Sequence, residues 1–568
     1  MLNAGMSRLS ERRAEYLAVL VPVVVMCAIG LWGLDRDGMW RDEAVTFQVA
    51  RRSVPQIRHL LGSVDAVHGL YYLLMHLVLA VHPGEVALRL PSVFGAALAT
   101  GLVAALGARL CRPRVGLWAG LAYAATPMVG HYAQEGRSYA LVAAGVAGAT
   151  LLLVRAVRGG RWWPYGAVLA VTCVLHEFAV LVLLAHACTL AFARVPGATW
   201  RRWGCAAGAV VVVLLPLVLV SWGQSAQVAW LTAPDGRSVE ELLERFTGSS
   251  PVLLGPYLVL MALAGGMARS KRDLSPAGVA LPLMVVPPAV LMGISQISPL
   301  YDDRYVLYSL AGAPLLAAAG AERAAGVLGR LRMGRRRLPA VPRQASYGHG
   351  AAVGAPVLPA PRGPAGRGGG VALRDAPRIS ASRAHDAVPP SLWVRCRGGA
   401  LLGVLAVCTV LVAQLPLLRA DRRADHRPDD LAGVSALVGR VVRPGDPVLF
   451  LPSLERRSAL AYPAGFKGVR DVALDVPAAE DGTLYGREAG PAELRRRLGG
   501  LTYVWVVSEP FALRSTWAPS NPTERAKLAM MTQEFITREE YVRRGITLRL
   551  YVRREEPWSA GSTQPRAS

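Results

Sequence analysis

The chain has 568 residues, of which 53% are hydrophobic, and a formal net charge of +24. Its mean hydropathy of +0.33 is too high for an ordinary soluble protein. The positive charge is mostly arginine, which in a membrane protein gathers in cytoplasmic loops, so it does not indicate a nucleic-acid partner. The seven cysteines show neither a disulfide framework nor metal-ligand spacing.

Eleven apolar segments are predicted to cross a membrane. They are residues 16–34, 91–108, 115–131, 138–154, 163–176, 178–193, 204–222, 252–268, 276–297, 305–320 and 399–418. With this count the N-terminus and every basic connection lie in the cytoplasm, as the positive-inside rule requires. The odd number of spans places the C-terminal region outside. We therefore expect a multi-pass protein of the plasma membrane.

Segment 70–81 is also apolar, but we do not count it as a span. Twelve helical residues reach about 18 Å, whereas the hydrocarbon core is about 30 Å thick. Counting it would also place every later basic connection on the wrong side. We predict that 70–81 is a helix in the outer interface, within a long outside loop that covers 35–90.

The chain is expected to divide into a membrane core and a soluble domain. The core is 1–322, followed by a basic Gly/Pro/Arg-rich stretch at 323–397 and the last span at 398–419. The basic stretch has no hydrophobic periodicity, so it is predicted to be disordered in the cytoplasm, with anionic lipid binding as the alternative.

Residues 420–568 have a soluble composition. Short apolar runs at 446–452, 502–510 and 547–554 alternate with polar, helix-forming stretches, which predicts a small α/β extracytoplasmic domain. The fold class is thus a polytopic α-helical membrane protein with a small α/β domain. That domain is a lid, an acceptor-docking domain or a stabilising appendage.

The predicted outside connections hold most of the chemistry-bearing side chains. They lie in 35–90, 131–139, 176–177 and 301–305, all at one membrane face. Arginine binds phosphate oxygens through paired charge-assisted hydrogen bonds, and a carboxylate can take the proton of an attacking hydroxyl. These groups together predict transfer from a lipid-linked phosphate to an alcohol.

Structural roles compete with this interpretation. Asp42 and Glu43 could cap the helix that follows them, because acidic residues favour helix N-termini. Glu135 and Arg137 could form a structural ion pair, and His176 could be a turn histidine. The acidic and histidine groups could jointly hold a divalent cation, although their spacing is not diagnostic. No tightly bound cofactor is expected.

An ordered set of motifs resembles the family 39 type of GT-C-fold glycosyltransferases. The motifs are W-x-D-E at 40–43, L-Y-Y-L-L at 70–74, R-L-P-S at 89–92, Y-x-Q-E-x-R-x-Y at 132–139 and R-Y at 304–305. Relatives in that superfamily include protein O-mannosyltransferases and lipid A aminoarabinose transferases. The resemblance covers roughly residues 10–320 and implies a polyprenyl-phosphate sugar donor, used at the outer face with inversion at the anomeric carbon.

The resemblance also assigns roles to residues. Asp42 matches the carboxylate that activates the acceptor, and Glu43 stands beside it. The residues expected to bind the donor or its phosphate are Glu135, Arg137, Tyr139, Arg304 and Tyr305. Further site candidates are Asp65, His68, Gln134, His176 and Asp303.

Mannose is the common sugar of the family, and the acceptor is a hydroxyl of a protein, glycan or lipid. Membrane lipids are the other expected partners. Two other classes compete. A secondary transporter would show broken segments at mid-membrane and an internal repeat, neither of which is obvious. A non-catalytic membrane scaffold would leave the first-loop carboxylates merely solvated.

Overall fold

The computed structural model describes residues 2–35, 38–265, 274–335, 403, 408–423, 427–514 and 516–554. Met1–Ala324 and Leu402–Ser568 form one compact unit, and Ala325–Leu401 form a second. The described part of the second unit is the end of helix α15 (Gly312–Arg335). The predicted basic segment therefore begins as helix, and its remainder, 336–397, lies outside the described residues.

Five described helices are long and apolar enough to cross a membrane, or six if one bent pair counts as a span. The five are α1 (Leu2–Leu31), α5 (Glu85–Leu110), α8 (Tyr139–Val157), α11 (Gly197–Gly223) and α14 (Pro276–Ile294). The bent pair is α12 (Gly236–Thr247) and α13 (Pro251–Ala264). Each of the five overlaps a predicted span.

Other predicted spans fall on shorter or broken helices. These are α6 (Pro113–Ala125) with α7 (Pro127–Ala133), α9 (Trp163–Leu175), η2 (Glu177–Leu181) with α10 (Val182–Phe192), and η4 (Asp303–Ala311) with α15. The break at Thr126 has a local cause, because a residue before proline disfavours the helical region. Much of the predicted span 399–418 lies outside the described residues, so the total of eleven stays a prediction.

The predicted outside loop folds into short helices. They are α2 (Arg41–Ala50), α3 (Val54–Leu61), η1 (Ala66–His68) and α4 (Gly69–Val81). Helix α4 coincides with the predicted helix at 70–81, burying Tyr71, Tyr72 and Met75 while Leu77 and Val81 stay exposed. Helix α5 begins at Glu85, before the predicted end of the loop.

The C-terminal region contains a mixed five-stranded sheet with strand order β2-β1-β5-β7-β6. Strand β1 pairs in parallel with β2 and β5, while β7 is antiparallel to β5 and β6. The strands are β1 (Pro447–Leu451), β2 (Arg470–Asp471), β5 (Tyr503–Ser508), β6 (Phe535–Arg543) and β7 (Ile546–Arg553), with a separate pair β3 (Leu474–Val476) and β4 (Arg487–Glu488). The predicted small α/β domain is confirmed.

Helices cover both faces of this sheet. They are α17 (Leu431–Val441) and α18 (Arg457–Ala461) on one face and α20 (Pro491–Gly499) and α21 (Pro522–Gln533) on the other. The short helix α19 (Ala478–Asp481) packs against α3. Side chains alternate along the central strands, so Val448 and Phe450 enter one core and Leu449 and Leu451 the other.

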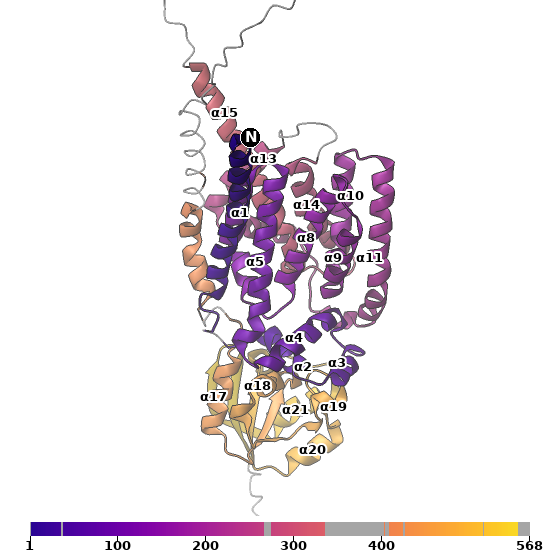
Figure 1. Cartoon of the computed structure of the whole chain (residues 1–568). Helices are drawn as coiled ribbons and strands as arrows, with labels where there is room; N and C mark the ends of the chain where they lie inside the picture. The colour runs from indigo at the N-terminus through magenta and orange to yellow at the C-terminus, as the bar shows by residue number, and fades with distance from the viewer. Residues whose placement is uncertain are drawn as a thin grey trace, which may run out of the picture. The chain divides into compact units, whose positions relative to one another are not determined.

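One of these cores is shared with the first loop. The cluster around Val448 and Phe450 also contains Phe47 of α2 and Met75 of α4. Figure 1 shows α2, α3 and α4 between the long helices and the C-terminal sheet. Burial of this shared apolar surface holds the first loop against the C-terminal domain. The C-terminal domain therefore helps to support the helix that carries Asp42 and Glu43.

Candidate active site

Asp42 lies between two arginines that come from distant parts of the chain. It is in the first turn of α2, and its Oδ2 accepts a hydrogen bond from Arg304 Nη1 at 3.0 Å. Arg137 Nη2 lies 3.6 Å from the same oxygen. The structure thus brings together three residues predicted from separate outside connections.

Glu43 is bound differently from its neighbour. Its side chain is fully buried and accepts two hydrogen bonds from Arg89, both at 2.9 Å, and one from the backbone amide of Gly136. Burial opposes its ionisation, but the charge and hydrogen bonds of Arg89 hold the pKa of Glu43 below its usual value. Glu43 therefore positions α2 against α5 and the loop around Gly136.

Aromatic rings form a wall beside the arginines. The guanidinium carbon of Arg304 lies 5.6 Å from the ring centre of Tyr305 and 6.0 Å from that of Tyr139. His176 lies 5.1 Å from Tyr305 and 5.6 Å from Tyr139, centre to centre. His68 follows at 6.4 Å from His176. These four predicted candidates therefore line one side of the arginine pair.

Asp65 and His68 face the site from the turn before α4. Asp65 has a left-handed backbone with φ 58°, and its Oδ2 accepts a hydrogen bond from Tyr72 at 2.7 Å. Burial raises the pKa of Asp65, an effect that Arg137 and the Tyr72 hydroxyl oppose. Burial, reinforced by Arg137, His176 and Arg304, lowers the pKa of His68 well below its usual value, which makes it a neutral imidazole.

Glu135 is a buried carboxyl group in the same cluster. Neither of its oxygens has a hydrogen-bond partner among the described residues. Burial raises the pKa of Glu135 to about 7, against the attraction of His131 and Arg304. Its charge therefore changes near neutral pH, where a carboxyl group is ordinarily ionised.

Two predicted candidates are anchored elsewhere. The side-chain amide of Gln134 donates to the backbone oxygens of Gly30 and Trp32, at 2.9 and 2.8 Å, which ties its turn to the end of α1. Asp303 pairs with Arg245 rather than with Arg304. Both side chains hold the walls of the site instead of facing Asp42.

Several contributing residues were not predicted. Asp302, beside the predicted Asp303, pairs with Arg304 Nη2 at 3.2 Å. Arg89 belongs to the R-L-P-S motif, and an arginine within an apolar helix was a usable signal because a buried charge needs a partner. Arg41 donates two hydrogen bonds to Asp429, at 2.9 and 2.8 Å. A local sequence pattern cannot predict this contact, because the two residues are 388 positions apart.

The cluster leaves polar atoms without partners. Several buried nitrogens have no hydrogen-bond partner among the described residues. They are Nε and Nη1 of Arg137, Nε of Arg304 and one ring nitrogen each of His68 and His176. Buried polar groups are normally paired, so this set suits an anionic or polar group that enters from outside the chain. Within the described ranges, no group of three His, Cys, Asp or Glu residues is arranged to hold a metal ion.

Comparison with known proteins identifies the fold. No protein-family model and no curated protein matches this chain. The crystal structure of ArnT from Cupriavidus metallidurans in the apo state is similar, with a TM-score of 0.54 and 14% identity over 94% of this chain and 97% of that one. The structure of ArnT bound to undecaprenyl phosphate gives a TM-score of 0.52, with the same identity and coverage.

This likeness extends over the membrane helices and the C-terminal domain together. The protein is therefore a multi-pass membrane protein. More specifically, it has the GT-C fold that the motif order resembled. The likeness shows the fold alone, so membership of family 39, the roles of the site residues and the orientation of the termini stay predictions.

Proposed function

We propose that this protein transfers a sugar from a polyprenyl-phosphate donor to an acceptor hydroxyl at the extracytoplasmic face of the membrane. The observation that carries the proposal is the shared position of Asp42 between Arg304 and Arg137. It combines a proton acceptor with two groups suited to bind phosphate. Arg137 Nε and Nη1 and Arg304 Nε have no hydrogen-bond partner among the described residues. The polyprenyl donor is further supported by a protein of the same fold that was solved with undecaprenyl phosphate.

In the proposed reaction, the acceptor oxygen attacks the anomeric carbon from the face opposite the phosphate. The new C–O bond forms as the bond between that carbon and the phosphate oxygen breaks, and the electron pair leaves with the phosphate. Arg137 and Arg304 neutralise the charge that develops on the departing phosphate. Asp42 takes the proton of the acceptor hydroxyl. A single displacement of this kind inverts the anomeric configuration.

The ion pair between Asp42 and Arg304 predicts that the donor binds before Asp42 can act as the base. A donor phosphate competes with the Asp42 carboxylate for the guanidinium of Arg304, because both form the same charge-assisted hydrogen bonds. Donor binding then frees Asp42 to accept a proton from the acceptor. Arg304 thereby couples the presence of the donor to the availability of the base.

The test is release of polyprenyl phosphate by the purified full chain in lipid nanodiscs. The chain is supplied with methyl mannoside as the acceptor alcohol and with polyprenyl-phosphate mannose, and then with donors that carry other sugars. We expect release by the wild type and a loss of at least about 100-fold in Asp42→Asn, which keeps the shape but cannot take the proton. Asp475→Asn is the matched control, because Asp475 is a half-exposed carboxylate of the C-terminal domain. Full activity in Asp42→Asn would overturn the assignment.

A further inference from the structure

A cavity of about 270 Å³ lies next to the proposed site. Its walls come from the segment before α12, from α12 itself and from the loop that precedes η4. The lining side chains include Trp230, Thr232, Ser238, Glu241, Asp302 and Asp303. Asp302 joins the two places, since it lines the cavity and pairs with Arg304, which in turn pairs with Asp42.

The wall of the cavity is held by hydrogen bonds to neighbouring elements. The backbone amide of Asp65 donates to the side-chain oxygen of Gln227 at 3.1 Å, and Gln224 bonds to the backbone on both sides of that residue. The side chain of Gln296, beyond the end of α14, donates to the backbone oxygen of Pro234 at 2.8 Å. These bonds fix the segment against the same turn that presents Asp65 to the site.

The lining selects a ligand by charge. Three carboxylates face one arginine, Arg245, which is already paired with Asp303. An anion would therefore meet a net negative surface here, so the donor phosphate belongs on Arg304 and Arg137 instead. Carboxylates such as that of Glu241 are good acceptors for ligand hydroxyl groups.

The size and shape of the cavity also limit the class of ligand that it can bind. Pockets for drug-sized ligands measure about 300–1,000 Å³, so a cavity of about 270 Å³ suits a single small ring. Trp230 is 63% exposed and offers a flat apolar face at the cavity. An aromatic face combined with hydroxyl-binding carboxylates matches a pyranose or furanose ring, which is apolar on its faces and polar around its edge.

We propose that this cavity binds one uncharged, hydroxyl-rich sugar ring beside Asp302. The proposal rests on the proposed function, which brings the donor sugar to the site and, where the acceptor is a glycan, a second ring. The ring is the sugar of the polyprenyl-phosphate donor or the sugar of a glycan acceptor. Glu241 and Trp230 are then specificity-determining residues for the transfer.

The experiment compares two lining variants with matched neighbours in the full chain. Glu241→Gln and Trp230→Ala change the cavity. Glu240→Gln and Trp222→Ala change exposed residues of the same kinds that do not line it. Binding of polyprenyl-phosphate mannose, glucose and arabinose, and of bare polyprenyl phosphate, is measured for each. The KM for methyl mannoside as an acceptor is measured where the wild type turns over.

If the cavity holds the donor sugar, the lining variants bind a sugar-bearing lipid about tenfold more weakly and bind bare polyprenyl phosphate normally. If it holds the acceptor sugar, donor binding is unchanged and the KM for methyl mannoside rises about tenfold. The proposal is overturned if the lining variants and the control variants have the same affinities and the same KM. It is also overturned if the lining variants bind bare polyprenyl phosphate as weakly as they bind the sugar-bearing lipid. A wild type that binds these lipids but never releases polyprenyl phosphate contradicts the proposed function, while the binding comparison still decides the cavity.

Discussion

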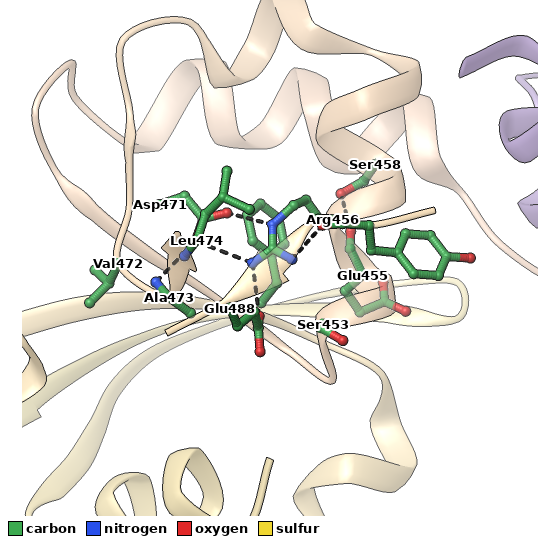
Figure 2. Close-up of polar contacts among 12 residues, drawn as sticks. Ser453, Glu455, Arg456, Ser458, Asp471, Val472, Ala473, Leu474 and Glu488 are labelled. Carbon is green, nitrogen blue, oxygen red and sulfur yellow. Dashed lines mark hydrogen bonds and ion pairs between the residues drawn. The ribbon is translucent and has the colours of Figure 1, made fainter. Parts of the chain in front are cut away.

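Two buried charge clusters in this protein differ in how fully their polar atoms are paired. In the C-terminal domain, Arg456 donates from Nε to Asp471 at 2.6 Å and from Nη2 to Glu488 at 2.8 Å (Figure 2). Its Nη1 donates to the backbone oxygen of Tyr485 at 2.8 Å. Every nitrogen of that guanidinium is used. A buried arginine in this state holds loops and strands together and leaves nothing for a ligand.

The cluster around Asp42 has similar charges but incomplete pairing. Two nitrogens of Arg137, one of Arg304 and both oxygens of Glu135 are buried without a partner among the described residues. Leaving such groups unpaired costs stability, which is a cost that sites for ligands ordinarily carry. The difference between Arg456 and the two arginines beside Asp42 lies in hydrogen-bond satisfaction rather than in charge or burial. It favours a structural role for Arg456 and a ligand-binding role for Arg137 and Arg304.

Exchanging the arginine in the candidate site gives the largest expected effect on activity. Arg304→Met removes a proposed phosphate-binding group, so we expect transfer to fall about 100-fold or more, the loss typical of one group that stabilises charge in a transition state. Arg304→Lys should recover part of this activity, because lysine keeps the charge but cannot bind two oxygens in one plane. Release of polyprenyl phosphate measures both variants.

Thermal unfolding in the same lipid nanodiscs is the control for Arg304→Met. Its unfolding temperature should fall less than that of Arg456→Met, since Asp42 keeps Arg137 as a second partner and the carboxylates of Asp42 and Asp302 are more exposed than those of Asp471 and Glu488. A large fall in stability together with full transfer by the folded fraction would show that Arg304 belongs with Arg456 as a structural residue.

The opposite outcome is expected for the C-terminal cluster. Arg456→Met leaves Asp471 and Glu488 without their buried partner, which should lower the free energy of unfolding by about 3–5 kcal/mol. Transfer per folded molecule should not change. Denaturant unfolding of the variant and activity normalised to folded protein test the two halves of this prediction, and a selective loss of turnover would contradict it.

The pKa of Glu135 predicts that donor binding at the candidate site depends on pH. With a pKa of about 7, its carboxyl gains a negative charge as pH rises through neutrality, next to the place proposed for the donor phosphate. Donor affinity should therefore fall between about pH 6 and 8 in the wild type and vary less in Glu135→Gln, which stays neutral. Equal pH slopes in the two proteins would remove Glu135 from the phosphate site.

The stability of the folded protein should also change as Glu135 titrates, and the direction of the change can be derived. The folded pKa of Glu135 lies above the ordinary value of 4.5, so the folded form keeps a proton that the unfolded form loses. Stability contributed by this group is then present below about pH 4.5 and lost as pH rises towards 7. Glu135→Gln should accordingly raise the unfolding temperature at pH 8 and leave it nearly unchanged at low pH.

Much of the fold was predictable because membrane helices and buried strands leave strong local signals. The five long helices and strands β1, β5 and β7 lie where apolar runs predicted them. Strand β6 was missed because it is an edge strand whose side chains are largely exposed and charged, so its sequence lacks an apolar alternation. The shared core of α2, α4 and the sheet was also missed, because apolar patterns do not reveal which segments pack together.

The candidate site was partly predictable for a different reason. Placement at one membrane face grouped Asp42, Arg137 and Arg304, although 262 positions separate the first from the last. The sequence could not distinguish Asp42 from the adjacent Glu43, because that distinction depends on the orientation of α2 and on Arg89. Nor could it choose between Asp302 and Asp303, whose side chains pair with different arginines.

The smallest expected effect concerns the link between the two regions. Arg41 and Asp429 form a paired hydrogen bond whose acid side chain is fully buried, and this fixes the residue directly before Asp42. Asp429→Asn weakens the link without touching the proposed substrate, so it should lower kcat by about tenfold at most, with little change in the KM for the donor. Asp429→Glu should restore part of the rate.

Asp430 provides the matched control for this last prediction. Its carboxylate caps α17 by accepting from the backbone amide of Gly433 at 2.9 Å, so Asp430→Ala should cost about 1 kcal/mol of stability and leave kcat unchanged. If both variants lose stability alone, the C-terminal domain is only an appendage. If Asp429→Asn alone lowers kcat, the C-terminal domain helps to position Asp42.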